Sequence, residues 1–423
     1  MPDCRAMTAA AAVALPILVL CLGHVFSNAV RTIPAIAADV LMRDLGIGAE
    51  ALAQLTGIFP LAFAAVMIPV GIALDRHGVK RVSLCLLTVA GCGAMMAALA
   101  TGPWSMLLAQ VVLGAGCSGM LMCPITFAAR ALSAPRFATW SGIIQAVGNS
   151  GMLLSASPLA LLIEATDWRA GYWATAGLAA LAFALVAAFV PGERPEARPS
   201  RGLLGDCRDV VAMAWQPQLR AVVVLIFASF AAVLGLRGLW GGPWLMEAKG
   251  LPRVEAGNIL LAATVALTLG PALAGTLLRR FGRATALLAG SHLAAAALIL
   301  LLVAGGPGGP ASVAFGVAAM PAAWDLGLLI GFGLIISFQV LAFSLVRAAV
   351  PPEQAGRALS AANLSFFLGA AVLQSLSGLM AGWGGIAAAL LTFAAALILC
   401  AIAFLLLHRR RSSHPARPPE QEM

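Results

Sequence analysis

The amino-acid sequence predicts an all-α polytopic membrane protein whose twelve transmembrane helices form two pseudo-symmetric six-helix bundles. Three observations lead to this fold class. Of the 423 residues, 61% are hydrophobic and only 10% are charged, which is too few to cover the surface of a soluble domain. Apolar runs long enough to cross a bilayer recur along the whole chain. A short charged segment also occurs twice, about half a chain apart.

Twelve apolar segments are expected to span the membrane, with a longer polar break between the sixth and the seventh. The predicted spans are residues 9–33, 51–74, 82–101, 103–129, 138–163, 170–190, 220–243, 255–278, 284–304, 323–348, 357–380 and 385–407. This pattern predicts an N-terminal bundle at 1–190, a cytoplasmic linker at 191–219, a C-terminal bundle at 220–408 and a disordered cytoplasmic tail at 409–423. Within the linker, residues 203–215 are expected to form a short interfacial helix.

The basic residues predict the orientation of the chain. Its net charge of +9 would suggest nucleic acid in a soluble protein, but here it indicates Lys and Arg retained on the cytoplasmic side. With both termini cytoplasmic, all but six of the 26 Lys and Arg residues fall on that side. The six exceptions are Arg31, Arg43, Arg169, Arg237, Lys249 and Arg253. We therefore expect a multi-pass protein of the cell membrane (the inner membrane in a bacterium) with no nucleic-acid partner.

A charged turn joins the second and third predicted spans. It reads Gly71-Ile-Ala-Leu-Asp75-Arg76-His77-Gly78-Val-Lys80-Arg81, and a second version, Gly275-Thr-Leu-Leu-Arg279-Arg280-Phe-Gly282-Arg283, lies 204 residues later. The first pattern resembles the loop between helices 2 and 3 of major facilitator superfamily transporters, and parallel repeats are typical of such proteins. The resemblance implies that fold over residues 9–407.

The same resemblance implies a gate. In the family, the Asp of this motif pairs with a basic group in the outward-facing state, so Asp75 is expected to pair with Arg130 or Arg136 near the end of the fourth span. The gating residues predicted on this basis are Asp75, Arg76, Gly71, Gly78, Arg81, Arg130, Gly275, Arg279 and Gly282. The alternative is that the cations only set the topology.

Two arginines within spans are the strongest clue to a substrate. His24, Asn28 and Arg31 lie at i, i+4 and i+7 on one face of the first span. Arg237, Trp240 and Trp244 repeat a similar spacing in the seventh span, which is equivalent in the second half. Two converging guanidinium groups would favour an anion. The seventh span resembles the organophosphate/anion branch of the superfamily. The alternative is that both arginines snorkel to the outer interface.

Amide side chains supply further candidates. Ser141, Gln145 and Asn149 form a polar stripe on the fifth span, and Asn363 lies on the eleventh. Amides can bind a ligand or hold helices together. The complete predicted substrate set is Arg31, Arg237, Asn28, His24, Gln145, Asn149, Trp240 and Asn363.

Other patterns limit the coupling mechanism. Gln110 stands where drug/proton antiporters of the superfamily carry an Arg, and the Gly-Pro signature of their fifth helix is missing around Gly151–Pro158. Asp39, Glu164 and Asp325 are expected near the outer ends of spans. His24 is therefore the preferred candidate for a coupling proton, ahead of His292, which is expected to pack between helices.

The leading hypothesis is a secondary transporter, a symporter or antiporter, for a small organic or phosphate-like anion. An efflux transporter for apolar or cationic compounds is the alternative. A minor alternative is copper transport, suggested by Cys117, Met120, Met122 and Cys123. No catalytic cluster, resident metal site or cofactor motif is recognised, so an enzyme is not expected. The partners expected are a small-molecule substrate and the lipid bilayer, and the chain is expected to be a monomer.

Overall fold

The computed structural model describes residues 4–132, 134–192, 203–350 and 355–412. These residues form helices and connecting turns, with no strand among them, which confirms the predicted all-α class. Parts of the predicted linker and tail, residues 193–202 and 413–423, lie outside the described residues. The proposed bundle boundaries therefore stay predictions. A helix does begin at Leu203, where the interfacial helix was expected.

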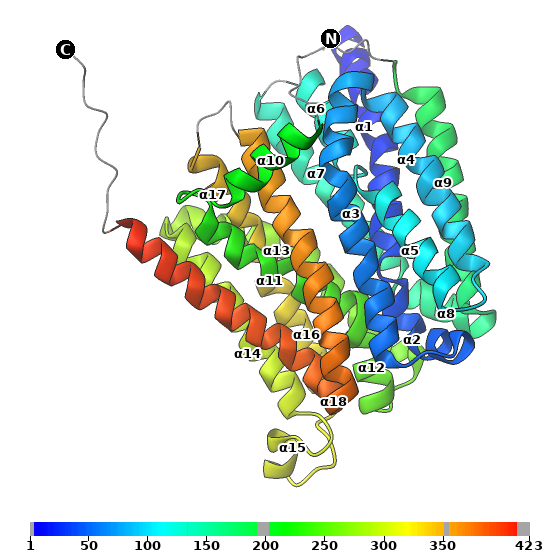
Figure 1. Cartoon of the computed structure of the whole chain (residues 1–423), viewed down its shortest axis with the longest axis vertical. Helices are drawn as coiled ribbons and strands as arrows, with labels where there is room; N and C mark the ends of the chain where they lie inside the picture. The colour runs from blue at the N-terminus through cyan, green and yellow to red at the C-terminus, as the bar shows by residue number, and fades with distance from the viewer. Residues whose placement is uncertain (1–3, 133, 193–202, 351–354, 413–423) are drawn as a thin grey trace.

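Nine helices build the first half of the chain (Figure 1). Two of the six expected spans, 103–129 and 138–163, are each made of two helices, and α2 follows the first expected span. The elements are α1 (Cys4–Val30), α2 (Ile33–Leu45), α3 (Ala49–His77), α4 (Val79–Ala98), α5 (Pro103–Cys117), α6 (Met122–Ala131), α7 (Ala134–Leu154), α8 (Ser157–Ala165) and α9 (Trp168–Phe189).

The second half follows the same plan with more irregular helices. Its elements are α10 (Leu203–Ala214), α11 (Arg220–Gly235), the π-helix η1 (Leu236–Trp240), α12 (Gly241–Pro243), the π-helix η2 (Trp244–Ala248), α13 (Arg253–Phe281), α14 (Ala284–Ala304), α15 (Pro310–Ala314), α16 (Ala322–Ile336), the 3₁₀ helix η3 (Ser337–Val340), α17 (Leu341–Ala348) and α18 (Ala355–Ser412).

The described residues contain eleven continuous segments that are long and apolar enough to cross a membrane. The last of them, Ala358–Arg409, is 52 residues long. At 1.5 Å per residue it would measure about 78 Å, more than twice a hydrocarbon core of about 30 Å. The backbone leaves helical geometry at Gly384 and Gly385, and α18 turns back there (Figure 1). Two crossings within α18 bring the total to the twelve that were predicted.

The internal repeat is visible in the backbone. Helices α3 and α13 are both 29 residues long, and each bound of α13 lies 204 positions after the corresponding bound of α3. Each helix ends at a glycine with positive φ, +78° at Gly78 and +64° at Gly282. Because only glycine adopts this conformation without strain, the two motif glycines have a structural role at the turn.

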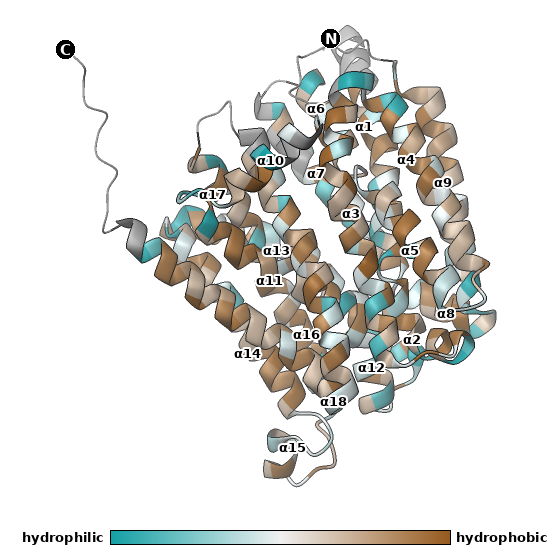
Figure 2. Cartoon of the chain, viewed as in Figure 1, coloured by the Kyte–Doolittle hydropathy of each residue, from teal (hydrophilic) through white to brown (hydrophobic). Residues whose placement is uncertain are grey.

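The two halves meet at the end of the molecule opposite the chain termini, which we call the distal end (Figure 1). There α2 packs against η1 and α12, α8 packs against α13, and α3 packs along α18. Contact is close enough to exclude a Cβ atom: one built on Gly242 would lie 1.5 Å from the carbonyl oxygen of Ala35. Figure 2 shows hydrophobic residues along the helices, with hydrophilic ones mainly at the helix ends.

Candidate functional site

Three spans are interrupted where the two halves face each other. Helix α1 stops at Val30 before α2, α7 stops at Leu154 before α8, and the seventh span becomes π-helical at Leu236–Trp240. A proline follows each interruption, and these are Pro34, Pro158 and Pro243. Proline cannot donate a backbone hydrogen bond, and its ring clashes with the carbonyl four residues earlier. Interrupted spans expose backbone polar groups inside a membrane protein, where transporters build binding sites.

Side chains bind the carbonyl groups that these interruptions release. Arg31 Nε donates to the carbonyl of Ser27 at 2.8 Å, and its Nη2 donates to the Ser27 hydroxyl. Thr32 Oγ1 donates to the carbonyl of Asn28 at 3.0 Å. Arg237 Nη2 donates to the carbonyl of Met152 in the last turn of α7.

Arg237 connects the interruptions through a set of polar side chains that we call the junction cluster, made of Thr32, Ser155, Arg237 and Thr264. Arg237 Nε donates to Thr264 Oγ1 on α13 at 2.7 Å, and Nη2 lies 3.4 Å from Ser155 Oγ. Ser155 Oγ also bonds to Thr32 Oγ1. Arg237 therefore joins the second half of the chain to the interrupted fifth span directly and to the first span through Ser155 and Thr32.

Arg31 lies against four aromatic rings, the phenylalanine cage formed by Phe59, Phe63, Phe230 and Phe367. The guanidinium carbon is 5.8 to 5.9 Å from each ring centroid, within the range of cation–π attraction. The first two rings belong to α3, while the others belong to α11 and α18. Phe63 and Phe367 stack across the two halves, with their ring centroids 3.7 Å apart. Arg31 is part-buried, so the cage leaves some of its surface open.

Each arginine keeps one nitrogen without a protein partner. Arg237 is 5% exposed, and its buried Nη1 has no hydrogen bond. In the part of the chain that the structure describes, Arg31 Nη1 also has none, and no carboxylate forms an ion pair with either arginine. Arg237 and Thr264 line a cavity of about 20 Å³, the size of one water molecule. These contacts do not fit the alternative that both side chains snorkel to the outer interface.

The other predicted substrate residues divide into two groups. Asn28 Nδ2 donates to the carbonyl of Gly148 at 2.9 Å and lies 3.4 Å from His24 Nε2, so both residues hold α1 against α7. Trp240 donates from Nε1 to Ser377 Oγ at 2.8 Å and is 1% exposed.

Three predicted amides are not tied into the helix packing. Gln145 is exposed, while Asn149 and Asn363 are half-buried. Among the described residues, none of the three has a hydrogen-bond partner. His292 packs between helices, as expected: its Nε2 meets the Ser229 hydroxyl and its Nδ1 lies 2.7 Å from the carbonyl of Leu288.

Sequence reasoning missed the phenylalanine cage and the polar partners of Arg237. The i, i+4 spacing of Phe59 and Phe63 puts them on one helix face, but nothing in the sequence says what that face meets. Two of the residues suggested for copper pack against different helices, Met120 against Gly23 of α1 and Met122 against Gly71 of α3. The sulfur of Met120 packs where a Cβ on Gly23 would be, and the described residues hold no group of three His, Cys, Asp or Glu that could bind a metal.

The predicted gating residues lie at the end that carries the termini. Arg130 Nη2 is 3.5 Å from the carbonyl of Leu74, the residue before Asp75. The side chain of Asp75 lies outside the described residues, so its predicted pairing stays a prediction. Arg279 donates to Thr276 of its own helix at 3.2 Å. Gly71 and Gly275 are half-buried, while Arg76 and Arg81 are exposed.

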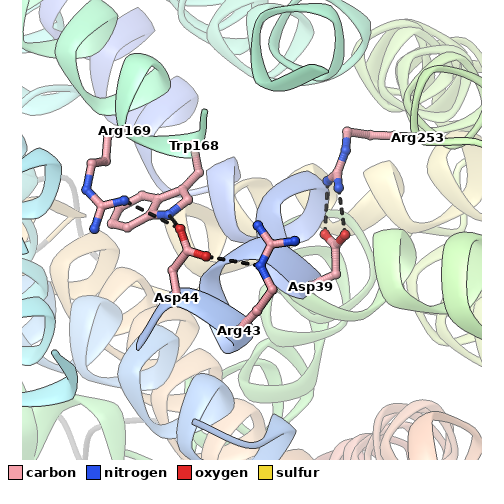
Figure 3. Close-up of polar contacts among 6 residues, drawn as sticks. All are labelled: Asp39, Arg43, Asp44, Trp168, Arg169 and Arg253. Atoms are coloured by element: carbon pink, nitrogen blue, oxygen red, sulfur yellow. Dashed lines mark hydrogen bonds and ion pairs between the residues drawn. The ribbon is translucent and has the colours of Figure 1, made fainter. Parts of the chain in front are cut away.

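Ion pairs gather at the distal end (Figure 3). Arg253 of α13 donates two hydrogen bonds, of 2.9 and 2.6 Å, to the carboxylate of Asp39 on α2, and this pair joins the two halves. Asp44 accepts a 2.9 Å bond from Trp168 Nε1 and pairs with Arg43 and Arg169. The Trp168 indole N–H, helped by Arg43 and Arg169, lowers the pKa of the Asp44 carboxyl.

Comparison with known proteins gives a consistent result. The sequence profile of the Major Facilitator Superfamily matches residues 20–372 and 243–423. No curated protein matches the sequence.

Solved structures agree with the family profile. The nucleoside transporter NupG, as a D323A mutant, is 16% identical, with a TM-score of 0.75 over 94% of this chain and 99% of that one. Two structures of a POT family transporter, one with 5-aminolevulinic acid and one with a thioalcohol-conjugated peptide, are 12% identical. Their TM-scores are 0.76 and 0.75, over 94% of this chain and 96% of theirs. At these identities the similarity shows a shared fold.

Proposed function

Since the chain belongs to the Major Facilitator Superfamily, we propose that it is a secondary transporter for a small organic or phosphate-like anion. One observation carries the choice of an anion. Two arginines lie between the halves of the molecule, each with an Nη1 that no described protein group binds. A buried cation without a counter-charge is unfavourable, and an anionic ligand would supply one.

The arrangement also supports an alternating-access mechanism. The halves are in contact at the distal end, where Arg253 and Asp39 join α13 to α2. If both termini are cytoplasmic, as the distribution of Lys and Arg predicts, this conformation is closed to the outside. Rocking the halves about the junction cluster would separate Arg253 from Asp39 and close the opposite end around Arg130 and the end of α3.

A first test compares anion exchange by purified protein in proteoliposomes with exchange by Arg31→Gln and Arg237→Gln variants. We expect each variant to lose about tenfold or more in transport rate, because a hydrogen bond to a charged group is worth about 1.5–3 kcal/mol. Glutamine keeps a polar group in the cluster while removing the charge.

The matched control is Arg43→Gln, at an exposed arginine of the distal end. It should transport anions at the wild-type rate. Wild-type rates in both of the Arg31 and Arg237 variants, with folded protein confirmed by size-exclusion chromatography, would contradict the paired-arginine proposal.

Efflux of apolar compounds remains a second candidate, because the phenylalanine cage offers an apolar surface between the halves. Resistance of overexpressing cells to a panel of apolar and cationic dyes would favour this candidate. The efflux candidate also predicts that cells expressing the Arg31→Gln variant keep this resistance.

A further inference from the structure

We propose that the anion carried by this protein has an apolar, preferably aromatic, body, and that the phenylalanine cage selects it while Arg31 binds its charged group. This inference rests on the proposed function and narrows its substrate class from anions in general to aryl carboxylates and related organic anions.

The phenylalanine cage surrounds the charged group of Arg31. The guanidinium of Arg31 is about equally far, 5.8 to 5.9 Å, from four ring centroids. Its Nε and Nη2 are bound by Ser27, so the side chain is held in position while Nη1 stays available. An anion that reaches Nη1 must place the rest of its structure beside these rings.

The rings themselves form a connected surface. Phe367 stacks on Phe63 at 3.7 Å and meets Phe230 edge-on at 5.1 Å. Phe230, Phe367 and Arg31 are all half-buried, which leaves part of this surface accessible although it lies between the halves. An aromatic body could stack on Phe230 or on Phe367. Each such aromatic pair adds affinity beyond the burial of its area.

A polyhydroxylated or multiply charged anion fits this surface poorly. Its hydroxyl groups would lose water beside the rings without gaining hydrogen bonds. Two polar side chains close to Arg31 in the sequence are already engaged: Ser27 binds Arg31, and Thr32 binds the carbonyl of Asn28 and Ser155. Inorganic phosphate could bind the arginine, but it would make no use of the cage.

The cage also spans the two halves, since Phe59 and Phe63 come from α3 while Phe230 and Phe367 come from α11 and α18. A ligand stacked there would contact both halves at once. Its binding energy would therefore depend on their relative position, which is the property that a transported substrate needs.

The experiment measures binding and exchange of three anions by the full-length protein: benzoate, acetate and inorganic phosphate. Benzoate and acetate share a carboxylate and differ in the ring. We expect benzoate to bind about tenfold or more tightly than acetate or phosphate, as expected from stacking and burial of one ring. Exchange of labelled benzoate in proteoliposomes should show the same order.

Ring-removing variants test the cage directly. Phe63→Leu and Phe367→Leu keep apolar bulk, and each should lower the benzoate-to-acetate affinity ratio about fivefold. Phe404→Leu is the matched control. Phe404 is fully buried, and its ring lies against His408 rather than against a ring of the cage, so its replacement should leave the ratio unchanged. Thermal unfolding and size-exclusion profiles verify that each variant is folded.

The outcomes separate this inference from the proposed function. Equal affinity for benzoate, acetate and phosphate, with binding still lost in Arg31→Gln, would overturn the aromatic selectivity and keep anion transport. An unchanged affinity ratio in both phenylalanine variants would likewise overturn the role of the cage. Failure of all three anions to bind, with Arg31→Gln behaving as wild type, would overturn both proposals.

Discussion

At the scale of single residues, the interior and the distal end use arginine differently. Arg253 has a carboxylate partner in Asp39, whereas Arg31 and Arg237 bind carbonyl and hydroxyl oxygens and have no carboxylate partner among the described residues. The two charges of an ion pair neutralise each other, but an arginine held by neutral groups keeps its attraction for an anion. This difference separates structural arginines from candidate binding groups better than the mere presence of Arg within a span.

Asp44 provides a test at this scale that does not depend on the substrate. Its lowered pKa means that the folded state favours the charged form. The resulting stability is fully present above the usual aspartate pKa of about 3.9 and is lost as the pH falls through the lower, folded-state pKa. Asp44→Asn should therefore lower the melting temperature at pH 7, and the difference should shrink as the pH falls below about 4.

Thermal unfolding in detergent between pH 3 and pH 7 measures this effect. Glu164→Gln, at an exposed carboxylate of the same end, is the comparison variant. A deficit of Asp44→Asn that persists undiminished at pH 3 would contradict the assigned cause.

At the scale of helices, a proline follows each of the three interruptions, and the interruptions explain where polar groups collect. Pro34 and Pro158 lie in the first turns of α2 and α8, directly after the breaks in the helical hydrogen-bond pattern of the first and fifth spans. The carbonyl groups released there are bound by Arg31, Thr32 and Arg237. The junction cluster is therefore a consequence of helix chemistry as well as of the residues that lie in it.

A Gly242→Ala substitution would test the packing of α12 on α2. A Cβ at this position would overlap the backbone oxygen of Ala35, which no side-chain rotation can relieve. Gly242→Ala should therefore disfavour the conformation in which the distal end is closed. It should also increase thiol labelling of an Ala53→Cys variant, because Ala53 of α3 is fully buried against Gly378 of α18. Gly177→Ala is a suitable control, because a Cβ there meets no atom within 4 Å. Unchanged labelling in Gly242→Ala would show that the contact does not set the closed state.

At the scale of the whole molecule, the pair Arg253–Asp39 lies where the two halves must separate if the transporter alternates. Replacing either residue by alanine should weaken closure by about 1 kcal/mol, the value of a good partly exposed ion pair, and shift the ratio of the two conformations about fivefold. Spin-label distances between the halves measure this ratio.

Exchanging the charges of Asp39 and Arg253 distinguishes the effect of their ion pair from the effect of side-chain size. Asp39→Arg and Arg253→Asp should each open the distal end, and the double variant should restore closure in part. If the double variant is as open as the more open single variant, the two side chains do not act as a pair.

The sequence by itself determined the membrane class, the twelve crossings and the repeat, because these follow from the length of apolar runs, from positive charges and from glycines at turns. Gly78 and Gly282 could be matched in the sequence because a turn of this kind requires glycine wherever it occurs. Arg31 and Arg237 could also be singled out, since charge within a span is unfavourable and rare.

Only the tertiary structure decided what surrounds those arginines. Phe63 and Phe367 are 304 positions apart, and no local pattern indicates that their rings stack across the two halves. His24 and Asn28 share a helix face with Arg31, yet they meet α7 while Arg31 enters the phenylalanine cage. The sequence places residues on the faces of helices, but the packing of the halves decides which faces meet, because contacts between distant segments depend on the whole fold.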